Sequence, residues 1–449
     1  MDTIAAIATM GTRGGVGIIR LSGPDALRIG ESLFSPKPPR WESRKLYYGS
    51  LRSSLDGRFL DSGLFVWMQG PRSFTGEDVV EIHCHGGDLN QRRILEATLA
   101  AGGRLAEAGE FTRRAFLNDK MDLSQAEALM DVLQADTESA LDAAHAQMRG
   151  TLHGEVERIR KEMLQIISHL EVNIDFLQED VPLFDPAELA KRMDAAQEEV
   201  GNLLGTFRQG KVLREGLKIA LVGPPNAGKS SLFNALLREK RAIVTPVAGT
   251  TRDYLEEKLD LPQLPLVLVD TAGVRETEDP IEREGVHRSK QQIEEADLLL
   301  LLLDGSEPPP TSLHEWNLSE HEERCVVIRT KCDLPPHNEW PSDFRVDVEL
   351  SSETGAGLDA LLDQIRERFS LGEESVTEKA LVTKTRHAGA LQRTHIALGE
   401  AAGALRHQMP FEIVAGEMQL ALEAIGEIVG ATTPDDILNH IFSEVCIGK

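Results

Sequence analysis

A short run of glycines and small residues that ends in lysine and serine is the feature of this sequence that most directly suggests chemistry. Residues 223–230 are GPPNAGKS; the apolar run LKIALV precedes them and the helix-forming run SLFNALL follows. Strand, glycine-rich loop and helix in this order predict a phosphate-binding loop, because loop amides and the helix N-terminus both attract phosphate. We expect Lys229 to contact the β and γ phosphates and Ser230 to ligate Mg²⁺.

Further motifs follow in the order that a guanine-nucleotide site requires. Residues 249–251 (GTT) can complete the Mg²⁺ shell and sense the γ phosphate, and residues 270–273 (DTAG) follow an apolar strand run. Residues 330–333 (TKCD) end another such run, and residues 351–352 (SS) come after VDVEL. Asp333 can accept from both N1–H and the exocyclic amine of guanine, a donor pair that adenine lacks. Thr330 stands where asparagine is usual, so we expect somewhat weaker nucleotide affinity.

The group that activates the attacking water is not obvious from the residues. Ras-like enzymes place a glutamine directly after the DTAG motif, but this sequence has Val274, which has no polar group. Another side chain must act, and the switch region offers several. These are Glu276, Glu278, Asp279, Glu282, Glu284, Arg252 and Arg275. Asn226 could hold a monovalent cation through its side-chain carbonyl, or it could simply stabilise the loop.

The elements that must position these residues change character along the chain. Residues 1–115 mix β-rich runs (VGIIRL, SGLFVWM, VVEIHC) with helical spacing, which predicts an α+β domain. From Phe116 to about Gly210 the sequence is rich in helix formers with an apolar stripe. After Gly216, apolar runs alternate with helices as far as Phe369, which predicts a parallel sheet covered on both faces.

The chain becomes helical again over residues 379–449. About seventy helical residues bury a poor core alone. We therefore expect them to pack on the earlier helices, with the α/β module inserted between; the alternative is a separate C-terminal bundle.

Composition limits the possible classes of protein. The 449 residues carry a formal net charge of −25, yet residues 1–117 have 15 basic and 13 acidic side chains. The acidic remainder argues against a large autonomous nucleic-acid surface. The longest apolar run, residues 298–303, is far shorter than the ~20 residues of a membrane span. With no secretion signal and no CxxC pair, we expect a cytoplasmic, multidomain protein without membrane contact.

These motifs, together with both ends of the chain, resemble the tRNA-modification GTPase family MnmE (TrmE). The likeness includes DTIAAIAT, RGGVGIIRLSG, SFTGEDVVEIHCHGG, GEFTRRAFLNDKMDLSQAEAL, GPPNAGKSSLFNALL, TPVAGTTRD, DTAGVRE and the terminal CIGK. It implies an N-terminal α+β domain that binds folate and dimerises (1–117) and a discontinuous all-α helical domain (118–212 and 373–449). It also implies an inserted α/β P-loop GTPase domain (213–372).

The resemblance also assigns roles to individual residues. The implied GTP-binding residues are Asn226, Ala227, Gly228, Lys229, Ser230, Ser231, Thr245, Pro246, Val247, Ala248, Gly249, Thr250, Thr251, Asp270, Thr271, Ala272, Gly273, Thr330, Lys331, Asp333, Ser351 and Ser352. Ser230 and Thr251 would ligate Mg²⁺, and Asn226, Thr245, Val247 and Thr250 would hold K⁺ between two paired GTPase domains. Glu282 becomes the expected catalytic residue that positions water.

For the N-terminal domain, the resemblance implies a tetrahydrofolate derivative, 5-formyl or methylene, at Arg20, Glu81, Lys120 and Lys449. A folate presents a pterin that suits a carboxylate and an anionic tail that suits cations. The triplet His83-Cys84-His85 suggests a metal site, but strand alternation points Cys84 away from both histidines. Cys446 could be a nucleophile, although no base lies near it in sequence.

The implied function is K⁺-stimulated GTP hydrolysis by a homodimer that works with the FAD-dependent MnmG (GidA) family protein. Together they would add a carboxymethylaminomethyl-type group to C5 of the wobble uridine, position 34, of certain tRNAs. The rival is a ribosome-assembly-type regulatory GTPase without modification activity, which predicts a basic RNA-binding appendage that this sequence lacks. A folate enzyme that uses GTP only for assembly is a third possibility.

Overall fold

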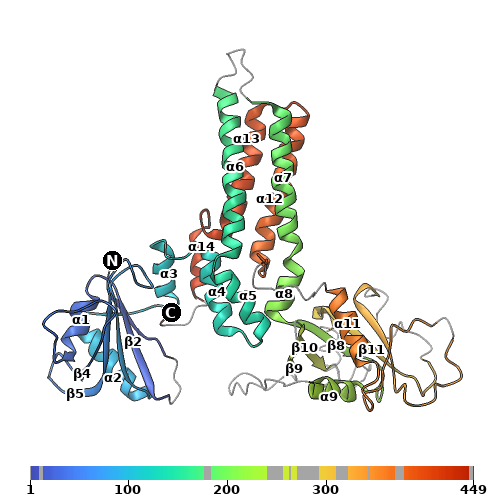
Figure 1. Ribbon diagram of the computed structural model, residues 1–449, viewed down its shortest axis with the longest axis horizontal. Coiled ribbons are helices and arrows are strands. Elements are labelled where there is room, and N and C mark those ends of the chain that lie inside the picture. The colour runs from blue at the N-terminus through green and yellow to red at the C-terminus, as the bar shows by residue number, and fades with distance from the viewer. Residues whose placement is uncertain are drawn as a thin grey trace, which may run out of the picture. The chain divides into compact units, whose positions relative to one another are not determined.

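The computed structural model describes residues 2–9, 14–175, 184–239, 256–261, 264–270, 293–309, 322–341, 344–369, 379–443 and 448 (Figure 1). The chain divides into two compact units. The first unit comprises residues 1–130, 153–185 and 404–449, and the second comprises residues 131–152 and 186–403.

The first unit contains a seven-stranded sheet near the N-terminus. Its strands are β1 (Ile4–Ile7), β2 (Val16–Ser22), β3 (Phe34–Ser35), β4 (Leu46–Arg52), β5 (Phe59–Met68), β6 (Val79–His85) and β7 (Arg104–Leu105). They lie in the order β3-β4-β5-β6-β2-β1-β7, antiparallel except for the β1–β7 pair. The predicted strand runs VGIIRL, SGLFVWM and VVEIHC are confirmed as β2, β5 and β6.

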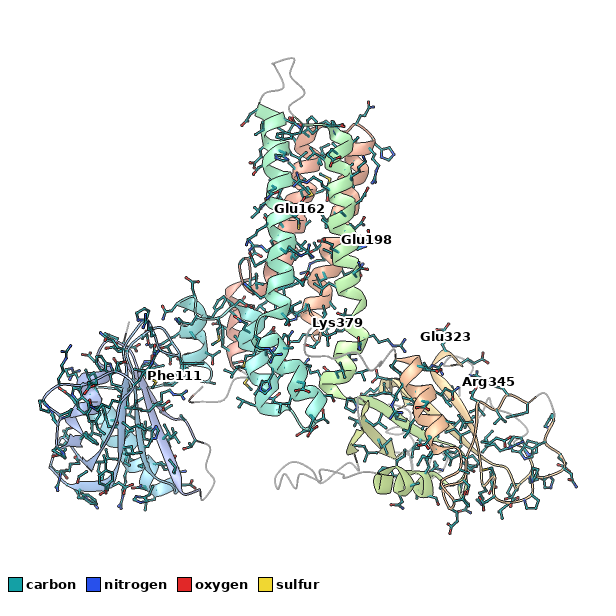
Figure 2. The ribbon with its side chains drawn as sticks, in the orientation of Figure 1. Phe111, Glu162, Glu198, Glu323, Arg345 and Lys379 are labelled. Carbon is teal, nitrogen blue, oxygen red and sulfur yellow. The ribbon has the colours of Figure 1, made fainter. Side chains whose placement is uncertain are left out.

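Helices α1 (Ala26–Ser32) and α2 (Asp88–Ala100) cover one face of this sheet. Phe65, Val80 and Ile82 are fully buried there, as strand alternation requires. The residues between them point to the other face, where α3 (Glu110–Leu117) contributes the fully buried Phe111 (Figure 2). Phe111 packs with Ile4 and Ala6 of β1. This second face carries Arg20 and Glu81.

The other helices of the first unit are α13 (Phe411–Val429), α14 (Asp435–Ser443) and most of α6 (Thr151–Asp175) and α4 (Leu123–Gln134). Leu123 and Phe442 share a buried cluster beside Phe116, whose ring lies 6.0 Å from that of Phe442. Gly430 ends α13 with φ +89°, and a Cβ there would come within 2.6 Å of the Phe116 ring. The segment after α13 therefore requires glycine at this position.

The second unit contains a six-stranded sheet. Its strands are β8 (Leu217–Val222), β9 (Glu256–Leu261), β10 (Leu264–Asp270), β11 (Leu298–Asp304), β12 (Cys325–Thr330) and β13 (Val348–Glu349). The order is β13-β12-β11-β8-β10-β9. The expectation of parallel pairing is confirmed from β13 to β10, but β9 pairs antiparallel with β10, so the sheet is mixed. The charged residues of EEKLDL in β9 suit such an edge strand.

Both faces of this sheet are buried, which explains the apolar run in β11. Leu298, Leu300 and Leu302 face one core cluster, and Leu299, Leu301 and Leu303 face the other. Helices α9 (Lys229–Glu239) and α11 (Leu358–Arg368) accompany the strands. The short 3₁₀ helix Glu322–Arg324 precedes β12.

The remaining helices of the second unit are α5 (Glu138–Met148), α7 (Pro186–Gly205), α8 (Phe207–Glu215) and most of α12 (Thr385–Arg406). The segments that enter and leave the α/β module lie together. Val382 N donates to Thr206 Oγ1 (3.0 Å), and a Cβ on Gly210 would come within 2.3 Å of Val382 O. Val212 and Leu381 belong to the same core cluster as the strands. None of the helices in the described segments combines the length and apolarity that a membrane span needs.

Candidate functional site

The phosphate-binding loop lies between the end of β8 at Val222 and the start of α9 at Lys229. Gly223 has φ +147°, and a Cβ on it would come within 2.3 Å of Leu302 O of the neighbouring strand. Asn226 adopts the left-handed conformation (φ +64°), which asparagine tolerates better than most residues. The motif therefore has the strand–loop–helix context that its sequence predicts.

The ammonium of Lys229 folds back over this loop. Its Nζ donates to the carbonyl oxygens of Gly223 (2.8 Å) and Pro224 (2.9 Å). Ser230 and Ser231 follow in the first turn of α9 and are exposed. A positive side chain beside a helix N-terminus favours a phosphate by charge and by dipole.

Thr330, at the end of β12, ties the loop to the sheet. It is 2 % exposed, and its Oγ1 lies 2.8 Å from Ala227 O and 3.1 Å from Leu303 O, so one hydroxyl proton serves two carbonyls. The side chain thus joins the phosphate loop, β11 and the base-recognition motif. The sequence gives no signal for this link, because it depends on residues 103 and 27 positions away.

The two motifs predicted to recognise the base lie side by side. Cys332 N donates to Leu350 O (3.2 Å), which brings the segment with the exposed Asp333 next to Ser351 and Ser352. Ser351 is buried, and its N–H donates to Ala356 O (2.9 Å). This arrangement gathers the predicted guanine-binding residues at one edge of the sheet.

Sequence reasoning missed Asp304, the last residue of β11. It forms an ion pair with Lys331 and accepts from Ser306 Oγ (2.6 Å). Burial works to raise the pKa of Asp304, but the hydrogen bonds from Lys331 and Ser306 outweigh burial and lower that pKa. An ionised Asp304 therefore fixes Lys331 beside the base-recognition loop.

Several predicted residues lie outside the described segments. These are Thr245, Pro246, Val247, Ala248, Gly249, Thr250, Thr251, Thr271, Ala272, Gly273, Glu282, Cys446 and Lys449. Asp270 is described by its backbone: it ends β10 opposite Leu221 of β8, beside the strand that leads into the phosphate loop. The roles of these residues stay predictions.

A second polar cluster lies on the N-terminal sheet. Arg20 of β2 and Glu81 of β6 are register partners, and Arg20 Nε (2.9 Å) and Nη2 (2.8 Å) both contact Glu81 Oε1. His83 Nε2 lies 3.2 Å from Glu81 Oε2. The pKa of Glu81 is lowered. The hydrogen bond from His83 contributes most to this lowering, and the nearby Arg20 adds to it, while burial works in the opposite direction.

The end of the chain reaches this cluster. Arg20 Nη1 donates to Gly448 O (3.1 Å), and Gly448 has φ +97°. A Cβ on Gly448 would come within 2.3 Å of Ile7 O, so only glycine fits between β1 and Arg20. The rings of Phe74 and Phe111 each lie 5.9 Å from the Arg20 guanidinium.

Lys120 is exposed. It lies beside Gly76, because a Cβ added to that glycine would come within 3.3 Å of Lys120 Cδ. Gly76 belongs to the loop that also carries Phe74. The three described residues among those predicted to bind folate thus lie around one part of the sheet. Cys84 points the other way: it is buried, and its thiol donates to Gly17 O (3.4 Å). Burial raises the pKa of this thiol to about 11.

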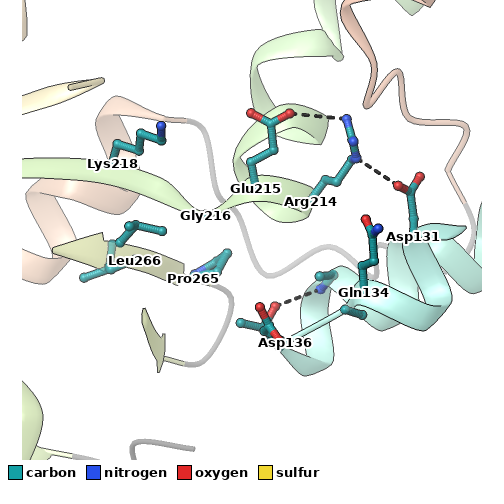
Figure 3. A pocket seen from close by; sticks show the side chains of 13 residues that line it. Asp131, Gln134, Asp136, Arg214, Glu215, Gly216, Lys218, Pro265 and Leu266 are labelled. Atoms are coloured by element: carbon teal, nitrogen blue, oxygen red, sulfur yellow. Dashed lines mark hydrogen bonds and ion pairs between the residues drawn. The ribbon is translucent and has the colours of Figure 1, made fainter. Parts of the chain in front are cut away.

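A pocket of about 520 Å³ lies elsewhere in the second unit (Figure 3). It is lined at the N-terminal ends of β8 and β10 by Lys218 and Pro265. Asp131 of α4, Arg214 of α8 and Asp136, in the segment between α4 and α5, line the rest. The phosphate loop follows the opposite, C-terminal end of β8. The pocket is therefore separate from the nucleotide site.

A mostly parallel sheet with a glycine-rich loop after β8, Lys229 folded over that loop and two adjoining segments predicted to recognise the base defines a P-loop GTPase. Comparison with known families shows to which family of GTPases the chain belongs. The MnmE helical domain model matches residues 123–446, and the model described as GTP-binding protein TrmE N-terminus matches residues 3–120. The chain belongs to the MnmE (TrmE) family of tRNA modification GTPases.

Curated relatives match over the full length. The chain is 45 % identical to the tRNA modification GTPase MnmE of Geobacter sulfurreducens, over 100 % of this chain and 99 % of that one. It is 43 % identical, with the same coverage, to the protein of that name from Heliobacterium modesticaldum. Among solved structures, Aquifex aeolicus Era bound to GDP and aluminium fluoride is 26 % identical with a TM-score of 0.27. That match covers 40 % of this chain and 66 % of the Era chain.

Proposed function

We propose that this chain hydrolyses GTP to drive modification of the wobble uridine of certain tRNAs. The observation that carries the proposal is the Thr330 link, which joins the Lys229 phosphate loop to the segment bearing Asp333. In this proposal, phosphate and guanine recognition lie on two segments that this hydrogen bond connects. Asp333 selects guanine, because its carboxylate accepts from two adjacent N–H groups.

The metals of the proposed reaction are Mg²⁺ and K⁺, and the described residues fit both. Ser230 is exposed at the start of α9, where a hydroxyl oxygen suits Mg²⁺, with Thr251 as second ligand. Asn226 is exposed in a left-handed turn of the loop, and its carbonyl oxygen suits K⁺ together with Thr245, Val247 and Thr250. These cations supply charge neutralisation at the phosphates. Glu282 would orient the attacking water in place of the missing glutamine.

The one-carbon unit would come from a tetrahydrofolate derivative bound at Arg20, Glu81, Lys120 and Lys449. The chemistry of the described donors fits such a ligand. Glu81 is an ionised acceptor on the sheet face, two aromatic rings lie near Arg20, and Lys120 is an exposed cation for an anionic tail. Arg20 would also hold the C-terminal segment next to the ligand through Gly448 O.

The proposed assembly is a cytoplasmic homodimer that acts with the FAD-dependent MnmG (GidA) family protein. The N-terminal domain would dimerise, and the GTPase domain would be inserted into the helical domain. The adjacency of α8 and residues 381–383, which flank the α/β module, supports that insertion. Together the two proteins would attach a carboxymethylaminomethyl-type group to C5 of uridine 34.

The proposal predicts a defined change in tRNA. Mass analysis of wobble uridines from cells lacking this chain should show loss of the modified nucleoside. The proposed reaction depends on GTP hydrolysis, and this chain is its only source in the proposal. The wild-type chain should restore it and Lys229→Ala should not. Lys191→Ala is the matched control: Lys191 is an exposed lysine of α7 with only a 4.0 Å contact to Glu188, and its variant should restore modification. Normal wobble uridines in the deletion strain would overturn the proposal.

A further inference from the structure

The excess of basic side chains in the N-terminal part of the chain is confined to one segment. Residues 36–72 carry seven basic and three acidic side chains, whereas the rest of residues 1–117 carries eight basic and ten acidic ones. The segment begins directly after β3 and includes β4, β5 and the first residues after β5. A nucleic-acid backbone binds through clustered lysine and arginine, so this segment is where such a contact could form.

The two ends of this segment meet beside the start of β4. Arg44, two residues before β4, donates from its backbone N–H to Trp67 O of β5 (2.7 Å). Its guanidinium donates through Nη2 to the backbone oxygen of Arg72, 28 positions along the chain. Ser43 Oγ also accepts from Gln69 N (3.0 Å). The side chain of Arg44 is therefore held against the segment that carries Arg72.

The connection between β3 and β4 is fixed to the sheet by Trp41. Its ring lies 4.4 Å from the Phe65 ring and 5.0 Å from the Tyr47 ring, against the core cluster that contains Phe65. Trp41 Nε1 donates to Glu31 Oε2 (2.8 Å). The exposed basic residues before and after this tryptophan are therefore attached to an anchored backbone.

The central charges of this surface have no acidic partner. Arg40, Arg44 and Arg72 are exposed, and in the part of the chain that the structure describes none of them forms an ion pair. Lys45 pairs with Glu42 (2.5 Å), but both side chains are exposed, so that contact is weak. Like charges held close together repel one another, and arginine is well suited to form paired hydrogen bonds with phosphate. A phosphate from outside the chain would relieve this repulsion.

We propose that Arg40, Arg44, Lys45 and Arg72 form a basic patch that binds the phosphate backbone of the tRNA substrate. This inference rests on the proposed function and adds a surface that belongs to neither the nucleotide site nor the folate site. Phosphate contacts fix the position of a nucleic acid but carry no sequence information themselves. The basic patch therefore orients the tRNA, in addition to the surface that the partner protein supplies.

The test measures the Kd of an unmodified tRNA transcript for the full-length chain by fluorescence anisotropy, between about 50 and 200 mM salt. The double variant Arg44→Gln/Arg72→Gln should bind at least about tenfold more weakly at the lowest salt. Its plot of log affinity against log salt should be shallower by about 2, because each lost phosphate contact removes about one unit of slope. Arg92→Gln/Arg93→Gln is the matched control, since it removes two exposed arginines of α2 and should bind as wild type does.

A further variant separates a lost contact from a lost fold. The side chain of Arg40 is exposed and makes no hydrogen bond or ion pair within the described residues, so Arg40→Gln should fold normally. It should weaken tRNA binding severalfold and lower the salt slope by about 1. Circular dichroism and GDP affinity of every variant should match those of wild type.

Four results would overturn the basic patch. They are absence of tRNA binding by wild type at the lowest salt, wild-type binding by the patch variants, an equal loss in the α2 control, and wild-type tRNA binding with altered sedimentation. The third result would mean that only net charge matters, and the fourth would assign the patch to a contact between protein chains. The proposed function is tested separately: normal wobble uridines in the deletion strain would contradict it even if the patch binds tRNA.

Discussion

Thr330 shows how one side chain can join two halves of a binding site. Its hydroxyl lies at the meeting point of the phosphate loop, β11 and the base-recognition motif, and it is shielded from water. The departure from asparagine at this position suggested weaker nucleotide binding. The observed hydrogen bonds show that threonine still forms a link to the loop.

Replacing Thr330 by valine should weaken GDP binding about fivefold, measured with a fluorescent GDP. Valine keeps the shape but removes the donor to Ala227 O and Leu303 O, and one hydrogen bond contributes about 1 kcal/mol. The loop would then be less well ordered before the nucleotide binds. Thr330→Ser is the matched control, because it retains the hydroxyl and should bind GDP nearly as wild type does. Equal affinity in Thr330→Val and wild type would show that the link does not support binding.

The sequence predicted the strand–loop–helix setting of the phosphate loop, but it did not predict how the side chains around that loop contact one another. The loop around Lys229 was identifiable because its spacing is local and is set by one strand–loop–helix unit. The pairing of Lys331 with Asp304 and of Glu81 with His83 was missed. Lys331 and Asp304 are 27 positions apart, and the residues around His83 suggested a metal triplet instead of a carboxylate contact. Only the register of the strands reveals such contacts.

At the scale of elements, periodicity predicted the helices after Phe116 but not where they break. α5 begins after Thr137, whose Oγ1 accepts from Ala140 N (3.1 Å), and Gly150 with φ +85° separates α5 from α6. Caps and left-handed glycines end helices without interrupting the apolar stripe, so composition alone does not show them. The same limit applies to β9: its charged residues interrupt the apolar pattern, so the sequence did not predict this edge strand.

Asp131, a buried carboxylate near the end of α4, contacts both the segment that leads into the α/β module and the segment that leaves it. Asp131 Oδ1 accepts from Arg214 Nε of α8 (3.0 Å), and Asp131 Oδ2 lies 3.4 Å from Lys384 Nζ, just before α12. The Asp131 side chain is 8 % exposed. Figure 3 shows Arg214 between Asp131 and Glu215. Asp131 therefore connects the incoming and the outgoing segment of the module.

Asp131→Asn should lower the free energy of unfolding of the second unit by about 2 to 3 kcal/mol. The variant removes the buried charge that pairs with both Arg214 and Lys384, and a broken ion pair at a buried carboxylate is costly. Urea unfolding followed by circular dichroism measures the shift. Glu215→Gln is the matched control: it removes the other partner of Arg214, but that carboxylate is 40 % exposed and contributes less than about 1 kcal/mol. Equal shifts in the two variants would show that Asp131 has no special role.

At the scale of the whole molecule, the distribution of charge matters more than its total. The net charge is −25, while residues 1–117 have a small excess of basic side chains. An acidic chain whose substrate is tRNA needs cations from elsewhere, because the phosphate backbone binds through lysine and arginine. We therefore expect the partner protein to supply most of the tRNA-binding surface.

Two copies of the GTPase module should associate when each holds GDP and aluminium fluoride in K⁺, and this association should accelerate hydrolysis. No arginine of the sequence is placed clearly as a finger, so in our proposal K⁺ at Asn226 provides the charge that stabilises the transition state. An arginine finger contributes about 10³- to 10⁵-fold. We expect K⁺ to raise the GTPase rate over that in Na⁺ by at least about tenfold, a modest part of that range.

Asn226→Ala should reduce this K⁺ stimulation and the association measured by sedimentation, while Asn234→Ala should leave both unchanged. Asn234 is the matched control because it is an exposed asparagine of the same segment, on α9 rather than in the phosphate loop. Both variants should still bind GDP, since neither removes Lys229 or Asp333. Because K⁺ binding and pairing are coupled in this mechanism, the two readouts must change together. A chain that hydrolyses GTP equally fast in K⁺ and Na⁺, or pairs equally in both, would contradict the mechanism at its central step.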